Sequence, residues 1–220
     1  MTMDYDLQEA AYNGDVRFLR QAVATERSEY FLRRIEPPTP NFDDKAGNII
    51  HIATLQDKED FIREAIKSLP REHLLLLFTQ QEPSRKSQNP LHFAAKRGYL
   101  GIIKIILEFY GGILLLKDSN YVKNNGCEKP WLACDSEGNT PLHVGLIENG
   151  NEECALEIMS MDLELLCNFE GEDDMSVLYV AVSRGCNRVA LEILSFSPSY
   201  SVKGRRYGLN LLNFLPRSSG

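Results

Sequence analysis

The chain has 220 residues, of which 43% are hydrophobic and 25% are charged. This composition argues against intrinsic disorder and indicates an ordinary soluble protein with a sizeable core. Its 31 acidic residues outnumber 24 lysines and arginines, for a formal net charge of -7. A negative chain repels the phosphate backbone, so no nucleic acid is expected as partner.

Targeting and redox signals are few. The start of the chain lacks the basic and apolar regions of a secretory signal. The longest apolar stretch, 101–116, is interrupted by Lys104 and Glu108 and is shorter than the roughly 20 apolar residues that cross a bilayer. The five cysteines form no CxxC pair and have no histidine at metal-ligand spacing. We therefore expect a cytoplasmic location, no direct membrane contact, reduced thiols, and neither metal nor cofactor.

A repeated pattern organises the chain from end to end. In its fullest copies, NPLHFAAKRG at 89–98 and TPLHVGLIENG at 140–150, a capping residue and proline precede leucine, histidine, small residues and glycine. A run with helical period follows each copy. The five units lie near residues 7–23, 44–66, 86–107, 135–159 and 172–194, and an incomplete sixth unit is expected at 205–215, as in a fragment of a longer protein.

Each position of the unit has a role in a helix pair. Asn89 or Thr140 can accept hydrogen bonds from the free N–H groups of a first helix, and the proline fits its first turn. Gly98 can adopt the left-handed conformation that ends this helix before a second, antiparallel one. Such a pair cannot bury its apolar face alone, so the repeats predict an all-α solenoid of stacked helix-turn-helix units.

The unit resembles the ankyrin repeat, whose TPLH sequence is intact at 140–143 and nearly so at 89–92. The resemblance implies a single ankyrin-repeat domain over 1–220, with finger loops between the units and an interaction role. Ankyrin units repeat about every 33 residues, but the spacing here is wider, so long insertions are expected at 24–43, 67–84 and 110–133. His73 beside Leu74–Leu77 predicts a helix within the second insertion.

A looser resemblance is to plant ankyrin proteins of the accelerated-cell-death type, which carry a C-terminal hydrophobic PGG domain. The segments that carry it are 138–143, 149–154 and 197–206. It implies a recognition module of a plant immune or defence signalling protein. The alternative is the cytosolic regulatory domain of a membrane-anchored protein of PGG or channel type.

The candidate chemical residues favour structural roles. His51, His92 and His143 recur once per unit, which predicts hydrogen bonds to the loop joining adjacent units rather than a shared metal. No nucleophile set or phosphate loop is found, so no enzyme is expected; an unrecognised site in the 110–134 insertion remains the alternative. The acidic runs at 43–44 and 170–174 lack calcium-loop spacing. Trp131 is either an anchor of its loop or a binding residue.

The predicted partner-binding surface has two parts. Residues before the end of each first helix should face the concave groove: Tyr12, Asn13, Leu55, Gln56, Lys96, Arg97, Glu148, Asn149, Ser183 and Arg184. The finger tips add Lys45, Asn48, Lys86, Gln88, Ser136, Glu137, Asn139, Asp173 and Met175. Because cations lie centrally and acidic residues follow, the expected partner is a protein or peptide with charges of both signs.

The last unit should leave apolar surface uncovered. Its second helix offers Val189, Leu191 and Ile193, and terminal repeats normally need a polar outer face. We therefore expect either self-association through this unit or coverage by the apolar residues of 208–215.

Overall fold

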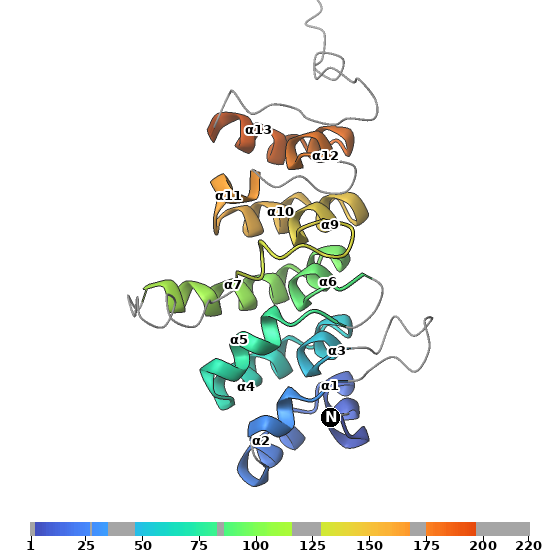
Figure 1. The fold of residues 1–220 in the computed structure, drawn as a ribbon, viewed down its shortest axis with the longest axis vertical. Coiled ribbons are helices and arrows are strands. Elements are labelled where there is room, and N and C mark those ends of the chain that lie inside the picture. The colour runs from blue at the N-terminus through green and yellow to red at the C-terminus, as the bar shows by residue number, and fades with distance from the viewer. Residues whose placement is uncertain are drawn as a thin grey trace, which may run out of the picture.

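The computed structural model describes residues 3–26, 28–34, 47–82, 86–115, 129–167 and 175–196. Within these ranges the regular structure is helical, and antiparallel helix pairs stack into an elongated column (Figure 1). First and second helices of the pairs are α1 (Tyr5–Asn13) and α2 (Val16–Thr25), α3 (Ile49–Leu55) and α4 (Glu59–Ser68), α6 (Pro90–Arg97) and α7 (Leu100–Leu115), α9 (Pro141–Glu148) and α10 (Glu152–Met159), and α12 (Val177–Ser183) and α13 (Asn187–Phe196). None of the helices described could span a membrane.

Capping side chains begin the first helices as the pattern predicts. Asn48 Oδ1 accepts from the N–H groups of Ile50 and His51 at 2.9 and 3.2 Å. Asn89 and Thr140 cap the next two first helices in the same way, each with proline in the first turn. These bonds satisfy N–H groups that have no partner inside the helix.

Small residues bring neighbouring first helices together. Ala94 and Ala95 on α6 are fully buried, and a Cβ atom added to Gly145 on α9 would lie 3.2 Å from the Ala95 Cβ. Large apolar side chains from the second helices complete the core, including Phe61, Ile102 and Ile106. Each pair thus buries its apolar face only by stacking on its neighbours.

Short elements follow several of the second helices. They are the 3-10 helix η1 (Ser28–Leu32), α5 (Arg71–Thr79) and α11 (Leu163–Cys167). The helix α5 confirms the one predicted in the second insertion, and it packs against η1, α3, α4 and α6. The predicted sixth unit, 205–215, lies outside the described residues.

The third insertion begins later than the sequence predicts. The helix α7 continues to Leu115 instead of giving way at residue 110, because Tyr110 and Ile113 prolong its buried face. Trp131 is 1% exposed and meets Tyr110 edge to face, with ring centroids 5.6 Å apart. Of its two predicted roles, the structure therefore favours that of loop anchor.

Gly98 is the position where the backbone most clearly needs glycine. It ends α6 with φ +73°, and an added Cβ would lie 2.8 Å from the Asn149 side-chain amide of the next unit. We expect Gly98→Ala to lower the free energy of unfolding by about 1 kcal/mol or more, because alanine is strained at positive φ. Urea denaturation followed by circular dichroism measures this.

Gly111→Ala is the matched control, since Gly111 lies within α7 and an added Cβ meets nothing within 4 Å. It should raise stability by about 0.5–1 kcal/mol through helix propensity. Equal effects of the two substitutions would contradict the assigned role of Gly98.

Candidate interaction surface

Two of the recurrent histidines bridge adjacent units. The Nδ1 atoms of His51 and His92 each accept from the backbone N–H of their own cap residue at 3.2 Å. Their Nε2 atoms lie 3.1 Å from the carbonyl oxygens of Gln88 and Asn139, in the loop before the next unit. Because Nδ1 accepts, the proton is assigned to Nε2, which donates to that carbonyl. This confirms the predicted structural role.

His143 repeats only part of this arrangement. Its Nδ1 lies 2.9 Å from Thr140 Oγ1. The Met175 backbone is close enough to favour the protonated ring, but Nε2 forms no hydrogen bond of normal geometry with a described residue. In the last unit Tyr179 takes the histidine position, and its N–H donates to Ser176 Oγ at 3.2 Å.

Burial keeps the three rings neutral. Desolvation lowers the pKa of His51 to about 3 and those of His92 and His143 to about 4, from an ordinary value of 6.5. A ring with such a pKa is uncharged at neutral pH and is poorly matched to proton transfer there. Among the described residues no group of three His, Cys, Asp or Glu side chains is placed to hold a metal ion.

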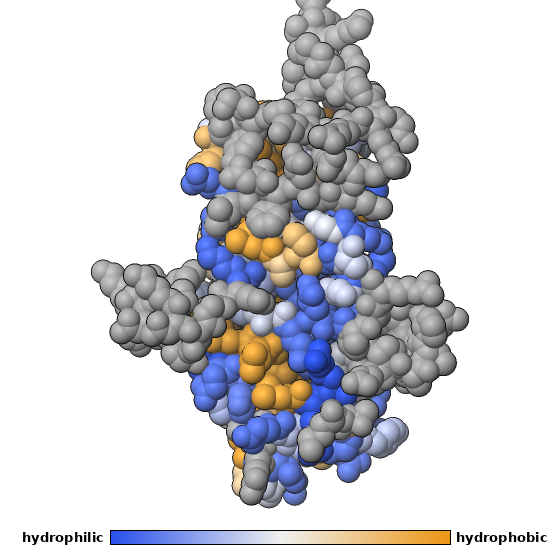
Figure 2. All heavy atoms as spheres, viewed as in Figure 1, coloured by the Kyte–Doolittle hydropathy of each residue, from blue (hydrophilic) through white to orange (hydrophobic). Residues whose placement is uncertain are grey.

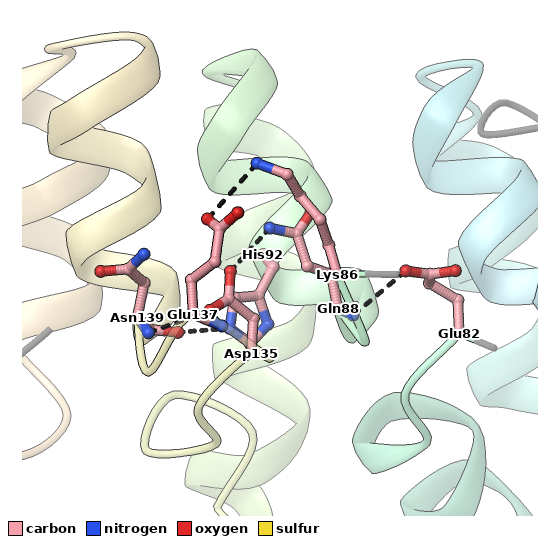
Figure 3. A network of polar contacts seen from close by, with 7 residues as sticks. All are labelled: Glu82, Lys86, Gln88, His92, Asp135, Glu137 and Asn139. Carbon is pink, nitrogen blue, oxygen red and sulfur yellow. Dashed lines mark hydrogen bonds and ion pairs between the residues drawn. The ribbon is translucent and has the colours of Figure 1, made fainter. Parts of the chain in front are cut away.

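Polar side chains lock together the finger loops, which we define as residues 86–89 before α6 and 135–140 before α9 (Figure 3). Gln88 Nε2 donates to Asp135 Oδ2 at 3.0 Å. The other oxygen of Asp135 accepts from the N–H groups of Glu137 and Asn139, at 2.9 and 3.0 Å. Lys86 Nζ lies 3.4 Å from Glu137 Oε2. Both loops are therefore held in place before any partner binds.

Four predicted contact residues are instead buried. Asn48, Gln88 and Asn139 are at most 3% exposed, and Leu55 is 9% exposed. The amide of Asn48, for example, donates to the Leu77 carbonyl at 2.9 Å. The prediction that these four residues contact a partner is wrong, because their side chains cap helices, join loops or fill the core instead of facing solvent.

Asp135 is a residue that the sequence analysis missed. It is 6% exposed and anchors a turn in which Gly138, at φ +83°, donates its N–H to the Asp135 carbonyl at 3.0 Å. The available signal was an aspartate three residues before a glycine, which is typical of a turn. Glu82, whose carboxylate accepts from the Gln88 N–H at 3.3 Å, had no such pattern.

The other described candidates are accessible along the edge of the column. Those at the ends of the first helices, which stack in succession, are exposed or half-buried: Tyr12, Asn13, Gln56, Lys96, Arg97, Glu148, Asn149, Ser183 and Arg184. Lys86, Ser136, Glu137 and Met175 on the fingers are accessible too. Lys45 and Asp173 lie outside the described residues. We call the nine helix-end residues the first-helix surface.

Charges on the two sides of the column differ in their pairing. The second helices are joined by ion pairs between units: Arg20 with Glu64 at 2.7 Å, Lys104 with Glu157 at 4.0 Å, and Arg188 with Glu153. By contrast, Lys96 and Arg97 on α6 make no ion pair or side-chain hydrogen bond with a described residue. The central cations of the first-helix surface are thus available to an outside group.

A family model, Ankyrin repeat, matches residues 87–119, which include most of the finger loop before α6, that helix and α7. The fold is an all-α ankyrin-repeat solenoid. None of the curated proteins compared with the chain matches it. Ankyrin repeats are generally non-enzymatic modules of protein–protein interaction, and the match suggests such a module here.

The buried histidines predict how stability depends on pH. Their folded pKa values lie below the unfolded value of 6.5, so the unfolded chain binds more protons between these values. The free energy of unfolding should be highest above pH 6.5 and fall as the pH approaches 4. At pH 5 each ring should lower it by about 2 kcal/mol. Urea unfolding at pH 7 and pH 5 measures the loss.

His92→Gln isolates one ring. The variant should be less stable at pH 7, where the bridge is lost, but its further loss at pH 5 should be smaller than that of the unsubstituted chain. An identical loss in both proteins would show that His92 does not titrate on unfolding as described.

Proposed function

We propose that the chain is a protein-binding scaffold that holds a protein or peptide segment of mixed charge against the first-helix surface. The observation that carries the proposal is the pair of cations at the centre of the column, Lys96 and Arg97, which have no partner among the described residues. Glu148 follows at the end of α9 and Arg184 directly after α12, and both are exposed. Acidic groups of the partner would face α6, and groups of alternating sign would face the following helices.

The finger loops support this function through their rigidity. A partner that meets a surface already fixed by hydrogen bonds loses less free energy to ordering. Lys86 and Glu137 pair across the two finger loops at 3.4 Å, which fixes the edge of the first-helix surface beside α6. The affinity for a partner then depends more on how well its side chains complement the surface than on ordering of the finger loops.

Reversing the two central charges tests the proposal. In Lys96→Glu/Arg97→Glu, affinity for a partner isolated with the unsubstituted chain should fall by about tenfold to a hundredfold, because attraction becomes repulsion. Isothermal titration calorimetry measures the change.

Arg17→Glu/Arg63→Glu provides the matched control, since it makes the same change of net charge on the exposed second helices α2 and α4. Loss of binding in this control, or unchanged binding in Lys96→Glu/Arg97→Glu, would contradict the assignment of the first-helix surface.

A narrower proposal concerns the biological setting. The resemblance of 138–143, 149–154 and 197–206 to plant accelerated-cell-death-type ankyrin proteins supports a recognition module in plant defence signalling. The alternative is a cytoplasmic regulatory domain of a membrane-anchored protein. The full coding sequence distinguishes the two settings, because only an anchored protein encodes further apolar segments of about 20 residues.

We also propose that the chain self-associates through its last described helix. Leu191 and Phe196 on α13 are 67% and 52% exposed, and both are large apolar side chains near the end of the column. Leu191→Asp should lower the mass found by light scattering, because a charge disfavours burial of this surface. A control is Leu76→Asp, which alters a comparably exposed leucine on α5. A mass that is the same in all three proteins rules out this contact.

A further inference from the structure

A hollow of about 690 Å³ lies between α5 and the segment 129–134. Its lining includes Arg34, Leu76, Gln81, Lys129, Leu132 and Cys134. We call this the α5 groove. No residue of the first-helix surface lines it, so it is a separate feature that the insertion after α4 adds to the column.

One part of the α5 groove is apolar and open. The helix α5 turns Leu74, Leu77 and Phe78 into the core, while Leu76 points away from it and is 53% exposed. The facing segment contributes Leu132, which is half-buried. In Figure 2 an apolar area, coloured orange, lies over α5 and is bordered by hydrophilic surface. This part can take an apolar side chain without rearranging the core.

The walls of the groove are fixed to one another. Gln81 Nε2 donates to the Cys134 carbonyl at 2.7 Å, which joins the segment after α5 to the opposite wall. Lys129 Nζ lies 2.7 Å from Asp162 Oδ2 and 5.9 Å from the centre of the Trp131 ring. The hollow is therefore a pre-formed feature of the fold.

Charge around the groove differs from that of the whole chain. None of the lining residues is acidic, although the chain has a net charge of -7. Arg34 is exposed and forms no ion pair with a described residue, whereas Lys129 is already paired. A carboxylate placed here meets an available guanidinium and no nearby competitor in the lining.

The wall at 132–134 also offers main-chain groups. The backbone N–H groups of Ala133 and Cys134 donate no hydrogen bond to a described residue. N–H groups of consecutive residues in an extended segment point to opposite sides, so one of the two can donate to a carbonyl of an extended peptide in the groove, as in recognition by strand addition. This donor, the apolar part and Arg34 together match a short extended segment.

We propose that the α5 groove binds an extended peptide segment of a partner protein in which an apolar side chain lies next to carboxylates. The apolar side chain packs between Leu76 and Leu132, a carboxylate pairs with Arg34, and the peptide main chain runs along 132–134. This surface goes beyond the scaffold function assigned to the first-helix surface and can be tested separately from it.

A random peptide library displayed on phage tests the proposal with the full chain as bait. The enriched peptides should carry an apolar residue flanked by aspartate or glutamate. The most enriched peptide, labelled with fluorescein, should then bind in an anisotropy titration, and binding should weaken as salt is added. No enrichment, or enrichment of peptides without acidic residues, overturns the proposal.

Matched variants locate the binding. Arg34→Glu/Leu76→Asp should lower the affinity for the labelled peptide by about tenfold or more, while Lys96→Glu/Arg97→Glu should leave this affinity unchanged. Both altered residues of the first variant are exposed, and thermal melting followed by circular dichroism checks its fold. Unchanged binding in the first variant, or loss only in the second, contradicts the proposal. If Leu76→Asp alone lowers the mass found by light scattering, the groove binds a second copy of the chain, and the proposal is overturned.

Discussion

The column depends on a hydrogen bond that leaves one unit and ends in the next. In His51 and His92 one ring nitrogen accepts from the cap of its own helix, and the other donates to a carbonyl of the following finger loop. A single side chain thereby sets the start of a helix and the position of its neighbour. Because the rings are buried, this bond forms where water cannot compete for either nitrogen.

The side chains freed by this arrangement are the ones that define the interaction surface. Caps, histidines and the finger network satisfy polar groups in the interior, and ion pairs satisfy the second helices. Among the described residues, the cations without an ion pair include Lys96 and Arg97 at the end of α6 and Arg34 beside α5. These cations are free to bind a partner because the fold does not use them.

Sequence reasoning succeeded where one residue performs one local task. The caps at Asn89 and Thr140, and the bridging histidines, follow from helix-start chemistry that repeats along the chain. It failed for Asn48, Gln88 and Asn139, because their burial depends on partners distant in the sequence: the Leu77 carbonyl, the Asp135 carboxylate and the His92 ring. The α5 groove could not be predicted either, since its two walls lie far apart in the chain.

The histidine hydrogen bonds that join adjacent units are not the same along the column. The ring of His143 keeps its cap contact, but its Nε2 atom has no hydrogen bond to a described residue, and Tyr179 occupies the next histidine position. In a linear array, cooperativity is transmitted only through contacts between nearest neighbours. The fourth junction therefore lacks the complete histidine bridge of the two junctions before it, and its units are joined instead by Arg188 through Glu152 and Glu153. When the array begins to unfold, we therefore expect the α12–α13 pair to open before the middle of the array does.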